Sequence, residues 1–100
     1  MATDKQFAEE IIEGLWEARI RPMMGEYVLY CREKVVGGIY DNRLLIKPVP
    51  KAQALLPEAR CELPYLGAKP MLLVENHDKA FLQELLFAVA DSLPAPKKRK

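Results

Sequence analysis

Three short apolar runs in the first half of the chain most constrain its fold. Residues 26–31, 35–40 and 43–47 are rich in β-branched and aromatic side chains, a composition typical of β-strands. The joins between them are short, and Asp41-Asn42 is a pair that favours turns. Strands joined this closely pair antiparallel with their neighbours. The sequence therefore predicts a three-stranded meander within an antiparallel sheet.

An amphipathic helix is expected before the meander. Apolar residues recur at helical spacing over roughly residues 4 to 19, with glutamates on the other side. Thr3 and Gln6 have the spacing of a capping box, and Pro22 excludes a continuation of the helix. Gly14 falls inside this helix, which we attribute to close packing against a strand.

Further elements are expected after the meander. Residues 51–56 predict a short helix, and residues 61–66 and 71–75 predict two more strands. Asn76 or Asp78 can cap a final amphipathic helix. The resulting order, αβββ(α)ββα, predicts a two-layer α+β domain with an antiparallel sheet of about five strands between N- and C-terminal helices.

This domain is expected to span residues 1–94, followed by a disordered basic tail over residues 95–100. No apolar run approaches the roughly 20 residues that cross a bilayer, and the first residues have no signal-peptide pattern. We therefore expect a cytoplasmic protein that does not contact membranes.

The cysteines and the histidine indicate no catalytic or metal chemistry. Cys31 and Cys61 lie far apart, without a CxxC motif, so neither a zinc site nor a redox pair is predicted. We expect both to be small buried hydrophobes. His77 with either cysteine would be a nucleophilic pair, but its polar surroundings favour a loop histidine. No catalytic residue, metal or cofactor is predicted.

Several predicted strands are apolar at consecutive positions, although a sheet with one face in water should alternate apolar and polar residues. These positions are Val35-Val36, Ile39-Tyr40, Leu44-Leu45-Ile46 and Met71-Leu72-Leu73-Val74. Two terminal helices cannot easily cover both faces. We therefore expect an uncovered face that binds a partner, with a homodimer as the favoured assembly.

Three segments carry a resemblance to a known family. They are Arg21-Pro22-Met23-Met24-Gly25 leading into Tyr27 and Tyr30, then residues 41–47 (DNRLLIK), and then Gly67-Ala68-Lys69-Pro70-Met71 followed by Val74. In this order they resemble the N-terminal domain of the TfoX (Sxy) competence-regulator family. The likeness covers the chain from Arg21 through the last helix.

The resemblance implies a two-layer α+β fold similar to type III secretion chaperones, which dimerise through a sheet or helix face. It implies a non-catalytic domain that acts by protein–protein contact or homodimerisation, in the regulation of competence or transcription. The family offers no catalytic residues to carry over. The protein partner itself is not indicated.

Six residues in or beside these motifs are candidate contacts to a partner or ligand: Arg21, Met24, Gly25, Arg43, Lys47 and Lys69. The four basic residues among them would receive an acidic group or a carboxylate ligand. The alternative is that they form ordinary surface ion pairs with Glu26, Asp41 and Glu62. A small-ligand-binding protein is a further alternative, and Trp16 is either a core residue or part of a recognition surface.

A nucleic-acid-binding regulator is the remaining alternative. Its contacts would come from the tail residues Lys97, Lys98, Arg99 and Lys100. These are four of the fifteen basic residues, so the rest of the chain has eleven basic and fourteen acidic residues. A body of that charge is a poor match for a phosphate backbone, and any nucleic-acid affinity is expected in the tail.

Overall fold

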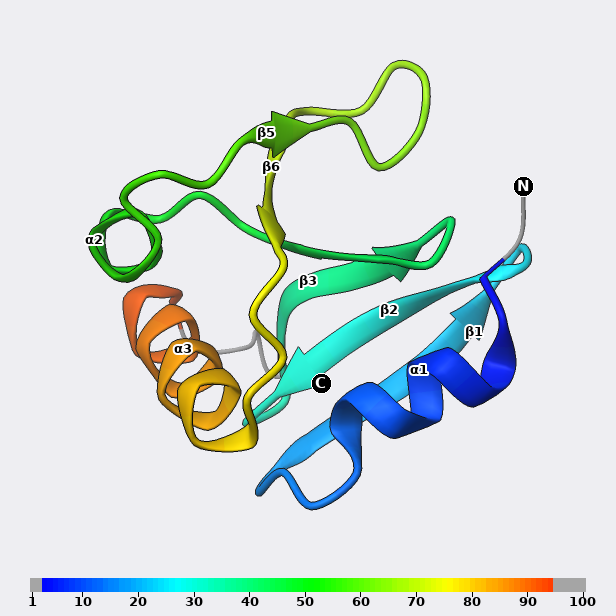
Figure 1. Cartoon of the computed structure of the whole chain (residues 1–100), viewed down its shortest axis with the longest axis horizontal. Coiled ribbons are helices and arrows are strands. Elements are labelled where there is room, and N and C mark those ends of the chain that lie inside the picture. Colours follow the sequence, from blue (N-terminus) through cyan, green and yellow to red (C-terminus); the bar gives the residue numbers. More distant parts are fainter. Residues whose placement is uncertain (1–2, 95–100) are drawn as a thin grey trace, which may run out of the picture.

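A six-stranded antiparallel sheet with the strand order β1-β2-β3-β4-β6-β5 forms the centre of the protein (Figure 1). The structure, a computed structural model, describes residues 3–94. The elements are α1 (Lys5–Ile12), β1 (Ala18–Met23), β2 (Glu26–Cys31), β3 (Lys34–Tyr40), β4 (Arg43–Ile46), α2 (Pro50–Leu55), β5 (Cys61–Glu62), β6 (Met71–Val74) and α3 (Lys79–Ser92). The prediction of an α+β domain with helices at both ends is confirmed.

The additional strand is β1, which occupies the end of the predicted first helix. Helix α1 stops at Ile12, and Gly14 then adopts a positive φ of 82°, a conformation that glycine reaches without steric cost. Strand β1 is an edge strand, where Pro22 is tolerated because its missing N–H would face outward. The predicted capping box is wrong, because Asp4 caps the helix through the Gln6 N–H.

Thr3 instead ties the start of the chain to the sheet. Its side chain is buried, and Oγ1 donates to Glu26 Oε1 at 2.6 Å and accepts the N–H of Asn42 at 3.2 Å. Glu26 Oε1 also accepts the N–H of Asp41 at 3.0 Å. Thr3 and Glu26 therefore hold the β3–β4 turn rather than cap a helix or pair with an arginine.

Tight turns join the first four strands. Both turn residues have positive φ in Met24-Gly25, Arg32-Glu33 and Asp41-Asn42, the geometry that suits two-residue hairpin loops. Arg32 is costly in this conformation. It is held by ion pairs to Glu17 at 3.2 Å and Asp91 at 2.9 Å. The β2–β3 turn is thereby fastened to α3.

The first face of the sheet is covered by helices. Leu29, Ile39, Leu44 and Ile46 of the strands are at most 1% exposed and pack with apolar residues of all three helices, such as Leu85 of α3. Two lysines cap helix ends on this face. Lys34 Nζ donates to the carbonyls of Ala90 and Leu93 at 2.9 and 3.1 Å, and Lys79 Nζ donates to the carbonyls of Glu10 and Ile11.

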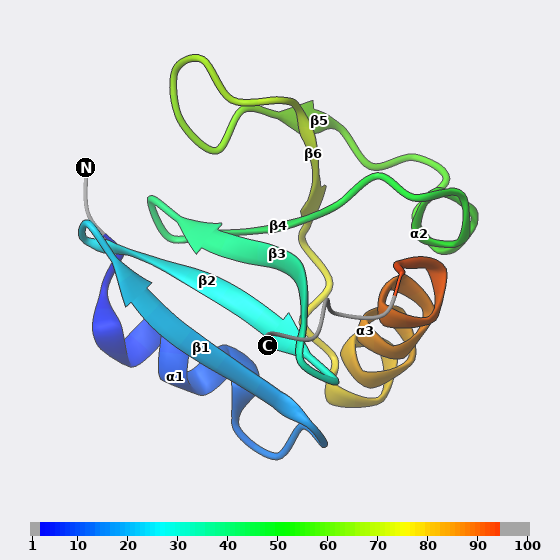
Figure 2. The same cartoon turned by 180° about the vertical axis from the view of Figure 1, so that it is seen from behind.

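The second face, toward the viewer in Figure 2, has no described helix over β1 to β3, and the β5–β6 loop stands at its β3–β4 end. The predicted strand 61–66 ends at Glu62, and residues 63–70 form a loop whose Tyr65 ring meets the ring of Tyr40 edge-on. Leu45 is completely buried on this face and Tyr40 is 7% exposed. The expectation that one copy leaves the second face uncovered is therefore wrong for Tyr40 and Leu45, whereas Val35 stays 36% exposed.

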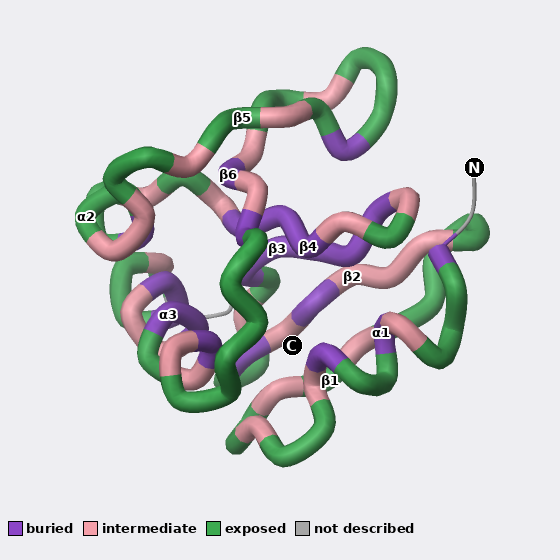
Figure 3. The backbone as a smooth tube through the Cα atoms, in the orientation of Figure 1, coloured by how far each residue is buried: buried purple, intermediate pink, exposed green. Residues whose placement is uncertain are grey.

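Figure 3 shows the same contrast along the backbone, because buried positions concentrate on the central strands and α3 while the β5–β6 loop is mostly exposed. Pro64 is the buried position within that loop. No helix within residues 3–94 is long and apolar enough to cross a membrane. The predicted tail, residues 95–100, lies outside the described residues.

Candidate binding groove

A groove with a volume of about 440 Å³ lies on the second face of the sheet. Three segments that are separate in the sequence line it: strand β3, residues 47–49 after β4, and residues 64–71 of the β5–β6 loop and the start of β6. Its surface is mainly apolar, with Val35 and Met71 among the lining residues. The groove is therefore formed only when the loop has folded back over the sheet.

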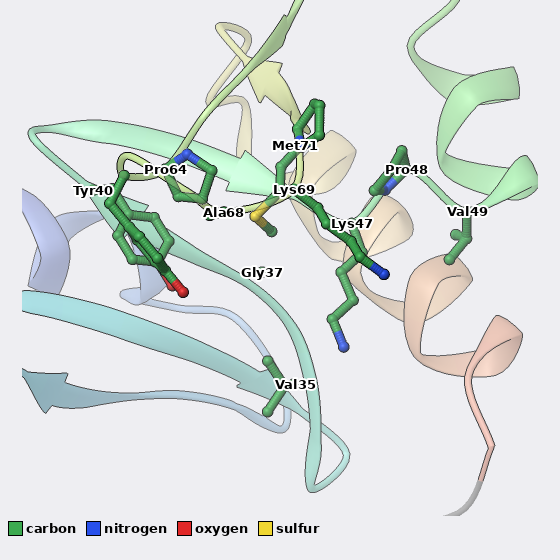
Figure 4. A pocket seen from close by; sticks show the side chains of 12 residues that line it. Val35, Gly37, Tyr40, Lys47, Pro48, Val49, Pro64, Ala68, Lys69 and Met71 are labelled. Atoms are coloured by element: carbon green, nitrogen blue, oxygen red, sulfur yellow. The ribbon is translucent and has the colours of Figure 1, made fainter.

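Tyr40 shapes one end of the groove, and its ring can lie there because Gly38 has no side chain (Figure 4). A Cβ on Gly38 would lie 2.3 Å from the Tyr40 ring, so the ring rests directly on the backbone of β3. The Tyr65 ring meets it at a centroid distance of 6.0 Å, within the range of favourable edge contacts. Burial raises the pKa of the Tyr40 hydroxyl, and the neighbouring Tyr65 and Glu26 raise it further.

Prolines stiffen the walls of the groove. Pro48 follows β4, and Pro64 and Pro70 lie near the two ends of the β5–β6 loop. Each proline fixes its φ and has no N–H that would need a partner. The loop is also held by Arg43, whose guanidinium pairs with Glu62 at 2.8 Å and donates to the Leu63 carbonyl at 3.2 Å. The groove is thus formed before any ligand arrives.

Two of the six predicted contact residues, Lys47 and Lys69, line this groove. Lys47 is half-buried and Lys69 is exposed. Figure 4 shows both side chains between Tyr40 at one end of the groove and Val49 at the other. The structure therefore brings these two lysines together at an apolar surface.

The other four predicted residues lie elsewhere. Arg43 is on β4 but is engaged with Glu62. Arg21 is exposed on the edge strand β1, and Met24 and Gly25 form the β1–β2 turn. Of the ion pairs weighed from the sequence, Arg43–Glu62 is present among the described residues.

The apolar part of the groove was not singled out from the sequence. Val35 was noted as one of two consecutive apolar strand residues, which is the signal that a second face is apolar. Tyr65 was assigned to a strand, although it lies in the loop that forms one wall. The sequence does not tell that this loop folds back toward β3, and for that reason the groove could not be predicted from it.

The cysteines and His77 are not assembled into a site. Cys31 is buried, and burial raises the pKa of its thiol. Cys61 is exposed on β5, so the prediction that both cysteines are buried is wrong for Cys61. His77 Nε2 lies 3.0 Å from the Val74 carbonyl, and its ring meets Phe7 edge-on. Within residues 3–94 no three His, Cys, Asp or Glu side chains are grouped to hold a metal ion.

Trp16 is a second exposed feature. Its side chain is 73% exposed, so the core interpretation is wrong. Gln83 of α3 holds its backbone from both sides, since Oε1 accepts the Trp16 N–H at 2.6 Å and Nε2 donates to the Trp16 carbonyl at 3.2 Å. The indole is therefore presented from a fixed backbone.

The fold and the groove define a small α+β domain with an open, mainly apolar groove. A relative from Spirochaeta aurantia, an uncharacterized 12.7 kDa protein in the trpE 5′ region, is 37% identical over 105 aligned residues that span 100% of this chain and 91% of the relative. The chain belongs to the same family as that protein. No protein-family model matches the chain, and no solved structure matches it.

Proposed function

We propose that this chain is a non-catalytic, protein-binding domain of the cytoplasm whose groove receives a segment of a partner protein. The observation that carries the proposal is the preformed apolar groove between β3 and the β5–β6 loop. Its volume of about 440 Å³ lies within the range of roughly 300–1,000 Å³ that is usual for small-molecule sites, and side chains of a partner segment would fill the same space. Tyrosine and methionine line it, and both are enriched at protein interfaces.

The resemblance to the TfoX N-terminal domain supports the same proposal. Two of the three segments that carry it reach the groove, since Lys47 ends one and Ala68 to Met71 belong to another. We therefore propose a TfoX-N-like role in the regulation of competence or transcription. Deletion of the gene in its host should then change transcript levels of DNA-uptake genes, and unchanged levels would reject this part of the proposal.

Homodimerisation is the second candidate, favoured by the exposed Trp16 and by Met24, which is 97% exposed. A dimer that pairs groove with groove would oppose Lys47 and Lys69 to the same lysines of the other copy, and like charges disfavour that contact. Light scattering at low micromolar concentration should show a dimer that Trp16→Ala dissociates. A wild-type mass of one copy would exclude self-association.

Selection from a phage-displayed library of random linear peptides tests the groove. We expect enriched peptides to bind the wild-type protein and to lose binding in Val35→Asp, which places a carboxylate at the apolar wall. Met23→Asp is the matched control, because Met23 on the edge strand β1 is 41% exposed, similar to Val35, and does not line the groove. Far-UV circular dichroism checks that both variants fold.

Two results would overturn the proposal. One is a selection that enriches no peptide, which would leave a small ligand as the occupant to pursue. The other is enriched peptides whose binding Val35→Asp leaves unchanged, because these would bind outside the groove.

A further inference from the structure

We infer that the segment bound in the groove is acidic, with aspartate or glutamate residues beside an apolar side chain. This inference rests on the proposed function and specifies its partner. Lys47 and Lys69 both line the groove, and no acidic residue lines it with them. Neither lysine forms an ion pair with a carboxylate within residues 3–94.

Among the other lysines and arginines within residues 3–94, six have a partner, whereas Lys5, Arg21 and Lys51, which do not line the groove, form no ion pair with a carboxylate. The arginines at positions 19, 32, 43 and 60 pair with carboxylates. Lys34 and Lys79 donate to helix carbonyls. Glu62, the carboxylate nearest the loop in sequence, is already shared by Arg43 and Arg60. The groove therefore carries positive charge that the fold itself does not neutralise.

The apolar walls increase what these charges contribute to binding. Lys47 is half-buried, and a lysine in such a position can cover apolar surface with its methylenes while its ammonium stays in contact with water. When an apolar side chain fills the groove it displaces water, and a charge pair at the rim then lies in a medium of lower dielectric constant than water. Carboxylates of the same segment are the complementary groups.

An acidic peptide fits this surface better than a nucleic acid does. Nucleic-acid binding relies on rows of cations that follow the phosphates, whereas the groove offers two lysines among prolines and aliphatic side chains. Outside the tail the chain also has more acidic than basic residues. The groove charge is thus a local feature, large enough for a few carboxylates of a short segment but too small to follow a phosphate backbone.

The test uses peptides enriched from the phage-displayed library, synthesised with a fluorophore and measured by fluorescence anisotropy. We expect aspartate or glutamate beside an apolar residue in the enriched sequences. Amide replacement of those acidic residues, or the change of either lysine to glutamine, should weaken binding about two- to fivefold. The double variant Lys47→Glu/Lys69→Glu should reject the acidic peptide and bind one in which lysine replaces the acidic residues. Lys51→Gln on α2 is the matched control and should change nothing.

The outcomes separate this inference from the proposed function. Peptides that need Val35 but carry no acidic residue, or that bind the lysine variants equally well, would overturn the inference and leave the groove as a protein-binding site. A selection that enriches no groove-dependent peptide would overturn both. Loss of acidic-peptide binding in the lysine variants, together with recovery by charge reversal, would establish the inference.

Discussion

The two faces of the sheet belong to the same strands but are closed in different ways. On the first face, helices cover Leu29, Ile39 and Leu44 to within 1% exposure. On the second face the loop residue Tyr65 meets Tyr40, whereas Val35 and the groove stay open. A helix supplies a continuous apolar stripe, whereas a loop with two prolines, Pro64 and Pro70, supplies a rigid but incomplete cover.

The lysines show the same difference. Those on the first face, Lys34 and Lys79, donate to the last carbonyls of helices. Those on the second face, Lys47 and Lys69, have no carboxylate partner within residues 3–94. The first face therefore carries the buried core, whereas the second keeps an open groove lined by two lysines without a carboxylate partner within residues 3–94. The following substitutions test this division.

Truncation in the helix-covered core should have the largest effect. Leu85 of α3 is completely buried, so Leu85→Ala should lower the free energy of unfolding by about 2–5 kcal/mol. Val35→Ala at the groove should cost less than about 1 kcal/mol, because Val35 is already 36% exposed. Urea denaturation measures both. Equal losses would show that the second face is as essential to the core as the first.

The second-largest difference in stability is expected between alanine substitutions of two adjacent glycines of β3. A Cβ on Gly37 would lie 2.2 Å from the Leu45 carbonyl oxygen, a backbone atom, whereas a Cβ on Gly38 would meet only the Tyr40 ring. Gly37→Ala should therefore cost about 1–3 kcal/mol. Gly38→Ala should cost less and displace Tyr40 from the groove, which the NMR shifts of the Tyr40 and Tyr65 rings would report. A reversed order of stability would contradict this view of Tyr40.

Substitutions of the lysines on the two faces should differ by a smaller amount in their effect on the free energy of unfolding. Lys34→Met removes two hydrogen bonds from an ammonium group to helix carbonyls and should cost about 1–2 kcal/mol. Lys47→Met and Lys69→Met should stay within about 0.5 kcal/mol of wild type. Urea unfolding of the three variants compares them directly. Destabilisation by the groove substitutions would mean that these lysines hold the loop in place.

A change to alkaline pH should have the smallest effect on stability, because it ionises one buried group on each face of the sheet. Burial raises the pKa of the Cys31 thiol on the first face and of the Tyr40 hydroxyl on the second. Stability from such groups is complete below their ordinary values of 9.0 and 10.0 and is lost as pH rises through the folded pKa. We therefore expect the urea midpoint to fall above pH 9.0, and Tyr40→Phe to remove part of the fall. A midpoint that does not change with alkaline pH would argue against the burial of both groups.

Patterns within single elements made much of the fold predictable. The meander, the short helix after Pro48 and the last helix capped by Asp78 agree with the structure within a few residues. Strand β1 was missed because Leu15 and Ala18 continue a helical spacing, although Gly14 at positive φ ends the helix. A glycine near the end of an apolar pattern was the available signal.

The groove was predictable only in part. Lys47 and Lys69 were predictable as contact residues because they lie in the motifs that resemble the TfoX family. Consecutive apolar residues in the strands indicated that the second face of the sheet is apolar. That a loop of the same copy covers Tyr40 depends on contacts between residues far apart in the sequence, such as Tyr40 with Tyr65 and Arg43 with Glu62. Local periodicity carries no information about such pairs.

The two-residue turns between β1 and β4 have a consequence for the order of assembly. Strands joined this way meet at little cost in loop-closure entropy, so we expect these four to form early during folding. Strand β6 is separated from β4 by α2, β5 and the long loop, so its pairing with β4 closes a longer chain segment and costs more entropy. We expect this pairing to form later. The side of the groove formed by β3 is therefore expected to fold early, and the side formed by residues 64–71 is expected to fold last. A partner bound in the groove would slow the local unfolding of the β5–β6 loop, because it contacts this loop and β3 at the same time.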